Sequence, residues 1–257
     1  EDPWNPNICS PNGAQAFEVF VMDHDGNVLP SSPYVTCDEI GYYWPVKVKH
    51  WATGNICWGS IFVEDKLPPV LDCPEVVIWC NEPSDPGNIV PYPGVTDNCD
   101  NYPFPQNCGD IDLEYHDDWI DYGCVPNNGF SGRIDRTWTA TDASGNSTSC
   151  VQVIKLQRAT LADLEWPPHF DGLPGNEPAF DCESACGQLL DGGDPAFDCT
   201  HYPYMHDPSW WIDGPQSVCE INVTYEDTRI DICDGSFKIL RDWRVVDWCT
   251  GEILEFT

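Results

Sequence analysis

Apolar and polar residues alternate in three stretches of the chain, and each stretch ends at a glycine turn. The stretches are Val46–Asn55, Arg136–Asn146 and Arg241–Glu252, and a second run follows the first two at Ile56–Glu64 and Ser149–Leu156. Alternation with a period of two predicts half-buried strands, so the stretches predict β-hairpins. Because they resemble one another, we interpret them as copies of one duplicated β unit. A repeated β unit is more typical of a structural or adhesive surface protein than of an enzyme.

The same patterns predict strands throughout the chain and very little helix. A hairpin is expected where Phe17–Met22 meets Val28 and Leu29 across the turn Asp23–Asn27. Further strands are expected at Trp44–Trp51, Ile56–Glu64, Val76–Cys80, Ile111–Tyr115, Arg133–Thr139, Ser149–Leu156, Val218–Tyr225, Phe237–Val246 and Glu252–Thr257. Only Leu161–Trp166 and Ser184–Leu190 suggest a helical turn or two. The prediction is an all-β chain of tandem Ig-like antiparallel β-sandwich repeats, disulfide-rich, with long loops and little helix.

Proline-rich joints and cysteine spacing divide the chain into repeats. Paired prolines at Pro68–Pro69 and Pro167–Pro168 follow strand-like runs, and such pairs end a strand and stiffen the link to the next unit. Cys9, Cys108 and Cys219 lie 99 and 111 residues apart, close to the length of an Ig-like sandwich of roughly 100 residues. We therefore predict a partial repeat over residues 1–65, a complete repeat over 66–166, and a third repeat over 167–257. The third begins with a long loop region and ends before its last strand, which suggests a segment cut from a longer array.

Fifteen cysteines are present, and their spacing shows no metal-binding rhythm. Such a number favours disulfides and an extracellular or otherwise oxidising compartment. The predicted pairs bracket similar strand-like segments, and each would contribute roughly 3 kcal/mol through the unfolded chain. They are Cys9–Cys37, Cys108–Cys124 and Cys219–Cys233. The odd cysteine is explained either by a truncated set of bridges or by an intermolecular disulfide.

The charge is strongly acidic, with 11 Lys and Arg against 43 Asp and Glu and a net charge of −32. Such a balance excludes nucleic-acid backbone binding as a main role and disfavours docking on anionic lipid. The sequence contains no membrane-spanning run. Self-repulsion loosens a compact state, so disulfides, divalent cations or a salty medium are expected to compensate.

Calcium is the one cofactor that the acidic turns suggest. Asp97, Asp100 and Asp142 lie at turns that could converge at one end of a sandwich and hold a hard cation. The alternative, which we favour, is that each aspartate caps its own turn. The loop around Asp23 is not an EF-hand, because Gly26 falls at its fourth position instead of the sixth.

Three motifs carry a resemblance to a known family. Pro68–Pro74 reads PPVLDCP, Val95–Cys99 reads VTDNC, and Trp138–Cys150 reads WTATDASGNSTSC. Together they resemble a hyalin repeat, and the likeness is closest to tandem repeats of very large surface adhesins of gliding and filament-forming bacteria. It is good over residues 66–156, fair over 207–257, weak over 1–65 and absent over 157–200. The resemblance implies an extracellular, non-catalytic β-sandwich repeat with an adhesive or structural use.

Tryptophan is the other unusual feature, with twelve in the chain. Trp51, Trp138 and Trp243 occupy matching repeat positions and are predicted to lie in the core. A second group lies in polar, loop-like settings, where an interface between subunits is favoured over stacking on sugar rings. These residues are Trp4, Trp119, Trp210, Trp211 and Trp248.

No catalytic constellation accompanies these features. The chain has no zinc motif, no nucleophile elbow and no phosphate-binding glycine loop. With this many acidic residues, paired carboxylates do not indicate a glycosidase. The sequence therefore predicts a non-enzymatic extracellular or cell-surface segment with a structural or adhesive role. Its expected partners are neighbouring repeats or copies of itself. The alternative is a carbohydrate-binding module that recognises surface glycans.

Overall fold

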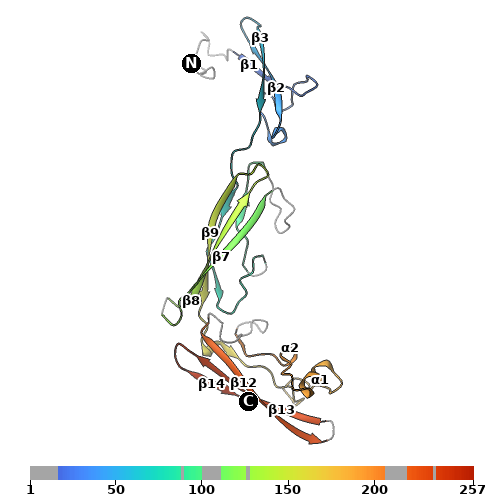
Figure 1. Cartoon of the computed structure of the whole chain (residues 1–257), viewed down its shortest axis with the longest axis vertical. Coiled ribbons are helices and arrows are strands. Elements are labelled where there is room, and N and C mark those ends of the chain that lie inside the picture. Colours follow the sequence, from blue (N-terminus) through green and yellow to red (C-terminus); the bar gives the residue numbers. More distant parts are fainter. Residues whose placement is uncertain (1–16, 88–89, 100–110, 126–127, 206–218, 234–235) are drawn as a thin grey trace. The chain divides into compact units, whose positions relative to one another are not determined.

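The structure is a computed structural model that describes residues 17–87, 90–99, 111–125, 128–205, 219–233 and 236–257 (Figure 1). Strands dominate it and helices are short, which confirms the predicted all-β, disulfide-rich class with little helix. Pairing is antiparallel in most of the sheets, with one parallel pair described below. By their contacts, the residues form two compact units. Unit 1 contains Glu1–Leu71, Val95–Leu113 and Ala140–Thr148, and unit 2 contains Asp72–Gly94, Glu114–Thr139 and Ser149–Thr257. The three repeats were predicted from sequence motifs, whereas these units are defined by contacts. The division into three repeats therefore stays a prediction.

Unit 1 contains a three-stranded antiparallel sheet in the order β1-β2-β3. The strands are β1 (Phe17–Val21), β2 (Tyr43–His50) and β3 (Ile56–Phe62). Alternation puts Val21 beside Val46 on one face, and both are buried. On the other face, the Lys47 ammonium lies 4.5 Å from the Phe20 ring centroid. Strand β3 is exposed along its whole length.

A four-stranded sheet follows in the order β5-β9-β8-β7, in which β5 and β9 run parallel. Its strands are β5 (Val76–Trp79), β7 (Asp112–Asp121), β8 (Phe130–Thr141) and β9 (Ser147–Gln157). In β8, buried and half-buried positions alternate over ten residues, as the apolar–polar pattern predicts. Two short strands that the sequence analysis missed, β4 (Val70–Asp72) and β6 (Gly94–Thr96), pair with each other.

The C-terminal part of unit 2 contains a second three-stranded antiparallel sheet, β12-β13-β14. Its strands are β12 (Ile221–Cys233), β13 (Ser236–Asp247) and β14 (Ile253–Phe256), coloured orange to red in Figure 1. Strands β10 (Leu164–Glu165) and β11 (Tyr204–Met205) form a separate short pair. Strands β7 and β12 run well beyond their predicted ends, because their distal halves are polar and exposed and so lack an apolar signal.

Helical structure is confined to short segments. The predicted turn at Ser184–Leu190 is confirmed as α1 (Ala185–Asp191), with Ser184 as its N-cap. The other predicted helical stretch contains only the 3-10 turn η2 (Leu161–Asp163) before β10 begins. Two short helices were not predicted: α2 (Phe197–Thr200) and the 3-10 turn η1 (Cys37–Glu39).

Three hairpins of the described chain each have a glycine with positive φ in the turn. The glycines Gly54, Gly145 and Gly251 have φ angles of 71°, 86° and 75°. The N–H groups of Gly54 and Gly251 donate to carbonyls four residues back, at His50 and Asp247, and the N–H of Gly145 donates to the carbonyl of Asp142, three residues back. Positive φ is strained for residues with a side chain, so glycine is required at these turns. The three repeated stretches therefore form hairpins with a glycine turn, as predicted, but the turn after Asp142 is one residue shorter than the other two.

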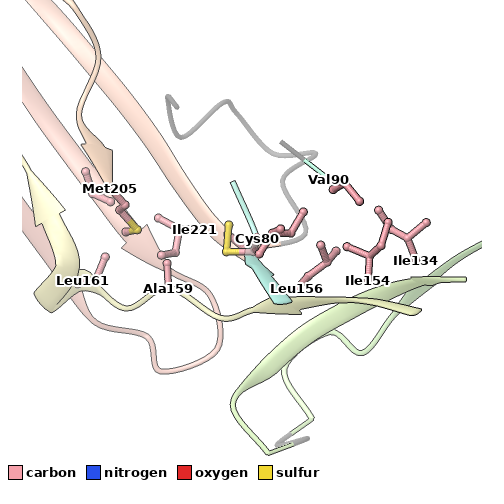
Figure 2. Close-up of a cluster of buried hydrophobic side chains, with 12 residues drawn as sticks. Cys80, Val90, Ile134, Ile154, Leu156, Ala159, Leu161, Met205 and Ile221 are labelled. Atoms are coloured by element: carbon pink, nitrogen blue, oxygen red, sulfur yellow. A yellow bond between two sulfur atoms is a disulfide. The ribbon is translucent and has the colours of Figure 1, made fainter. Parts of the chain in front are cut away.

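The main core of unit 2 draws residues from both of its larger sheets (Figure 2). Ile134, Ile154 and Leu156 come from the four-stranded sheet, and Ile221 and Val245 come from the C-terminal sheet. Met205, Ala159 and Leu161 fill the space in the same cluster. Residues of the second and third predicted repeats therefore share one hydrophobic core.

Candidate functional site

Five disulfides are present among the described residues, and they overturn the three predicted pairings. The bonds are Cys37–Cys99, Cys73–Cys150, Cys80–Cys219, Cys124–Cys249 and Cys186–Cys199. The predictions Cys9–Cys37, Cys108–Cys124 and Cys219–Cys233 were wrong, since Cys37, Cys124 and Cys219 have other partners and Cys233 is a free thiol. Cys9 and Cys108 lie outside the described residues. Pairing of sequence neighbours failed because four of the five bonds join cysteines that lie 62 or more residues apart in the sequence.

Three of these bonds join one predicted repeat to the next. Cys37–Cys99 links the first range to the second, and both Cys80–Cys219 and Cys124–Cys249 link the second to the third. Cys80 and Cys219 are 7% and 1% exposed and belong to the core of Figure 2. A disulfide removes freedom from the unfolded chain, so these bonds stabilise the association of repeats as well as each repeat.

Polar contacts reinforce the two bonds between the second and third ranges. Arg158 donates to the Sγ atom of Cys249 at 2.7 Å and to the carbonyl of Gly123, next to Cys124. The Asn81 amide, next to Cys80, donates to the carbonyl of Met205 at 3.3 Å. Both disulfides are therefore flanked by side-chain hydrogen bonds within unit 2.

A buried arginine cluster in the four-stranded sheet was not predicted. The guanidinium of Arg136, whose side chain is 1% exposed, donates to both carboxylate oxygens of Asp117 at 2.7 Å. Its Cζ lies 4.7 Å from the Tyr115 ring and 5.9 Å from the Trp138 ring. Trp138 is fully buried and donates from Nε1 to the Gln152 amide oxygen at 3.0 Å. Arg136 Nη1 makes no hydrogen bond within the described structure.

The C-terminal sheet repeats this cluster with the same residue types. Arg241 donates to both oxygens of Asp227 at 2.7 and 2.8 Å, and its Cζ lies over Tyr225 and Trp243 at 5.2 and 5.6 Å. Strand register places Asp227 opposite Arg241 and Tyr225 opposite Trp243. Here the remaining donors are used as well, because Arg241 also bonds the Thr200 hydroxyl and the Pro195 carbonyl.

A short sequence motif marks both clusters. Tyr-x-Asp recurs at Tyr115 and Tyr225, each followed by Arg-x-Trp on the next strand. The predicted core positions of Trp138 and Trp243 are confirmed, but the prediction for Trp51 was wrong, since it is 73% exposed. Trp138 and Trp243 each lie four residues before the carbonyl that accepts the turn glycine N–H. The residue four positions before the corresponding acceptor, His50, is Val46, which is buried.

The turn aspartates bind their own backbone. Asp142 accepts from the Asn146 N–H at 2.7 Å and from its side-chain amide at 2.8 Å. Asp97 accepts from the Cys99 N–H at 2.8 Å, while Asp100 lies outside the described residues. No group of three or more His, Cys, Asp or Glu residues within the described ranges is arranged to hold a metal ion. Calcium binding therefore stays a prediction, with these turn contacts supporting the capping alternative.

Asp23 makes the same kind of turn at the first hairpin. Its carboxylate accepts from the Asn27 side-chain amide at 3.0 Å, from the Asn27 N–H at 2.7 Å and from the Asp25 N–H at 3.0 Å. These hydrogen bonds, led by the Asn27 side chain, favour the ionised form and lower the pKa of Asp23. The side-chain amide of Asn176 lowers the pKa of Asp171 in a comparable loop.

Two of the tryptophans that were predicted to lie in an interface are exposed. Trp119 is 57% exposed on β7, and Trp248 is 62% exposed after β13. Trp4, Trp210 and Trp211 lie outside the described residues. The subunit interface favoured for these positions stays a prediction, with sugar stacking as its alternative.

Comparisons with known proteins do not assign the chain to a family. No family model matches the chain, and no curated protein matches it. A similar solved structure is a protocadherin described as "PcdhgB3 EC1-4 in 50 mM HEPES", with 13% sequence identity and a TM-score of 0.27. The match covers 96% of this chain and 63% of that one. No helix in the described part of the chain is long and apolar enough to cross a bilayer. A disulfide-rich all-β fold of this kind fits an extracellular or secreted protein.

Proposed function

We propose that the chain is a structural segment of a long extracellular surface adhesin or filament, built from hyalin-like repeats that disulfides fasten to one another. The observation that carries the proposal is that Cys37–Cys99, Cys80–Cys219 and Cys124–Cys249 each join successive predicted repeats. The repeated hairpin turns and the hyalin-repeat resemblance support it. The role is non-catalytic, and neighbouring repeats or copies of the chain are its partners.

The bond pattern limits how far the chain can be pulled. The shortest covalent route from Cys37 to Cys249 crosses to Cys99, follows 25 residues to Cys124, and crosses again. At about 3.5 Å per residue, that route spans about 90 Å, plus the two bridges. Without the bridges, the 212 residues from Cys37 to Cys249 would extend to about 740 Å at the same rise. Such a segment transmits tension without long extension, as an adhesin stalk requires.

Single-molecule pulling on the oxidised chain between residues 37 and 249 tests the proposal. We expect a maximal extension near 100 Å, which rises several-fold after reduction. Replacing both Cys124 and Cys249 by serine moves the shortest route through Cys80–Cys219 and lengthens it to 49 residues, so the extension should nearly double. Cys57→Ser is the matched control, because Cys57 is an exposed free thiol. Equal extension with and without reductant would overturn the mechanical role.

A further inference from the structure

Strand β3 forms an open edge of the sheet in unit 1. In the order β1-β2-β3 it pairs with β2, and no other segment of the described chain pairs with it. Two hydrogen bonds at the ends of the β2–β3 ladder fix the orientation of its backbone. The His50 N–H donates to the Asn55 carbonyl at 2.8 Å, and the Val63 N–H donates to the Tyr42 carbonyl at 3.2 Å. The register between these two bonds therefore shows which residues of β3 face the open edge.

Every second residue of β3 has backbone groups that point away from β2. In an antiparallel pair, alternate residues of a strand form hydrogen bonds with the same neighbour. Counting in steps of two from Val63 assigns Ile61, Gly59 and Cys57 to the ladder with β2. The N–H and C=O groups at the remaining positions point to the open edge, and such an edge can accept another strand. These positions are Ile56, Trp58, Ser60 and Phe62.

This edge lacks the charges that protect the other edges. Natural edge strands avoid pairing with other chains through charged residues, proline, bulges or short length. β3 reads ICWGSIF and is exposed throughout. Among the described edge strands of more than four residues, it is the one without a charged side chain, whereas β7 and β12 are rich in acidic residues. An acidic edge would lose hydration beside Trp58 and Ile56. The edge that matches β3 in charge is therefore β3 of a second copy of the chain.

The sequence of β3 is also complementary to itself in one antiparallel register. When Gly59 lies opposite Gly59 of the second copy, Trp58 lies opposite Ser60, and Ile56 lies opposite Phe62. These four residues are the ones whose backbone groups point outward, so each such pair exchanges two hydrogen bonds. The register also places the large Trp58 ring beside a small side chain.

The charges near this edge do not oppose the pairing. Strands β1, β2 and β3 contain Glu18, Lys47 and Lys49 as their Asp, Glu, Lys and Arg residues, so the sheet lacks the acidic excess of the chain. The β2 strands of the two copies would lie three strand spacings apart, about 14 Å. That distance exceeds the Debye length of about 8 Å at physiological ionic strength, so repulsion between their lysines is screened.

We propose that two copies of the chain associate side by side through β3, which joins their sheets into one six-stranded antiparallel sheet with two-fold symmetry. The proposal rests on the partnership between copies in the proposed function, and it names the surface that they share. An edge of seven residues belongs to the small class of interfaces, below about 1,200 Å², so the association is reversible and needs a high concentration. Pulling experiments measure the disulfide tether within one chain, so a failure of either proposal is distinguishable from a failure of the other.

Sedimentation equilibrium of the oxidised chain tests the association. The Cys57→Ser variant is used, because Cys57 is an exposed free thiol in this strand. We expect the measured mass to rise reversibly from 28.9 kDa toward twice that value as the concentration reaches the millimolar range. Adding Trp58→Lys should abolish the rise, since it places a charge at the uncharged edge. Trp119→Lys is the matched control, because Trp119 is an exposed tryptophan on the edge strand β7, and it should leave the rise unchanged. A chain that stays monomeric, or one that dimerises despite Trp58→Lys, would overturn the proposal.

Engineered cysteines test the register. In the Cys57→Ser background, Gly59→Cys places two thiols at opposite positions with Cα atoms about 4.5 Å apart, within disulfide range. Gly59 has open space and no positive φ, so the position tolerates a side chain. Ser60→Cys is the control, because its two copies are offset by two residues and lie about 8–9 Å apart, beyond disulfide range.

The two cysteine variants are oxidised with glutathione and resolved on a non-reducing gel, and their linked peptides are mapped by mass spectrometry. We expect a covalent dimer linked through position 59 in Gly59→Cys and no link through position 60 in Ser60→Cys. Absence of the link at position 59 in a variant whose circular dichroism matches the parent, or equal linking at both positions, contradicts the proposed pairing. The sedimentation result for the Cys57→Ser chain decides the association even if a further variant fails to fold.

Discussion

At the scale of single residues, loss of the Arg136–Asp117 ion pair should clearly lower the free energy of unfolding. Arg136 is almost fully buried, so removing the charge of Asp117 would leave its guanidinium without a counter-ion. Breaking a buried pair from one side typically costs about 3–5 kcal/mol. We expect Asp117→Asn to lower the free energy of unfolding of the oxidised protein by about 3 kcal/mol, the lower end of this range. The Asp117 side chain retains 18% exposure, so water partly screens the pair.

The neighbouring residue supplies the control for this prediction. Asp118 contacts His116 across 3.6 Å, but both side chains are at least 70% exposed. Exposed ion pairs contribute about 0–1 kcal/mol. Asp118→Asn should therefore leave the urea midpoint nearly unchanged. Equal effects of the two substitutions would show that the buried cluster does not stabilise the sheet.

The Asp23 turn makes a prediction about pH. Hydrogen bonds from Asn27 and Asp25 lower the folded-state pKa of Asp23, so its ionised form is favoured in the folded turn. The turn therefore gains from this carboxylate above its unfolded-state pKa, and that gain disappears as pH falls through the folded-state pKa. Carboxyl chemical shifts followed by NMR should give a pKa below the ordinary value for aspartate. Asn27→Ala should raise it, and an unchanged pKa in that variant would contradict the assignment.

At the scale of elements, the hairpin turns depend on a backbone conformation that only glycine adopts freely. Gly145 has a φ of 86° with open space around it, so a methyl group would meet no neighbour and only the backbone would be strained. A residue with a side chain in that region costs about 1–2 kcal/mol. We expect Gly145→Ala to lower the melting temperature. Gly59→Ala is the control, since Gly59 also has open space but lacks a positive φ. Similar losses in both variants would refute the argument from φ.

Hairpins were the elements that the sequence predicted well. The turn glycine and the alternating flanks fix strand position locally, so β2, β3, β8, β9 and β13 begin and end close to the expected residues. Strands β4 and β6 have three residues each, too few for a period to show. The distal half of β12 is exposed and charged, and its pairing with β13 supplies order that no local pattern encodes.

At the scale of the whole molecule, the disulfide framework could not be predicted from spacing. Even six cysteines allow 15 arrangements, and three observed bonds have sequence separations of 77 or more. Which cysteines meet is decided by how strands from different repeats pack, and that information lies in the shared core. Cys80 and Cys219 illustrate this, because they meet inside the cluster formed by Ile78, Leu156 and Ile221.

Burial should also set the order in which these bonds are reduced. Disulfide exchange needs in-line access of a thiolate to sulfur, so exposed bonds react before buried ones. Cys37 is exposed and Cys99 half-buried, whereas Cys80 and Cys219 are both buried. A time course with dilute dithiothreitol, quenched with maleimide and mapped by peptide, should show Cys37–Cys99 opening before Cys80–Cys219. In strong denaturant the difference should disappear, because it comes from the fold and not from the bonds themselves. If Cys80–Cys219 opened as fast as Cys37–Cys99 in the native protein, the core between the second and third repeats would have to open locally, and it could not transmit tension as proposed.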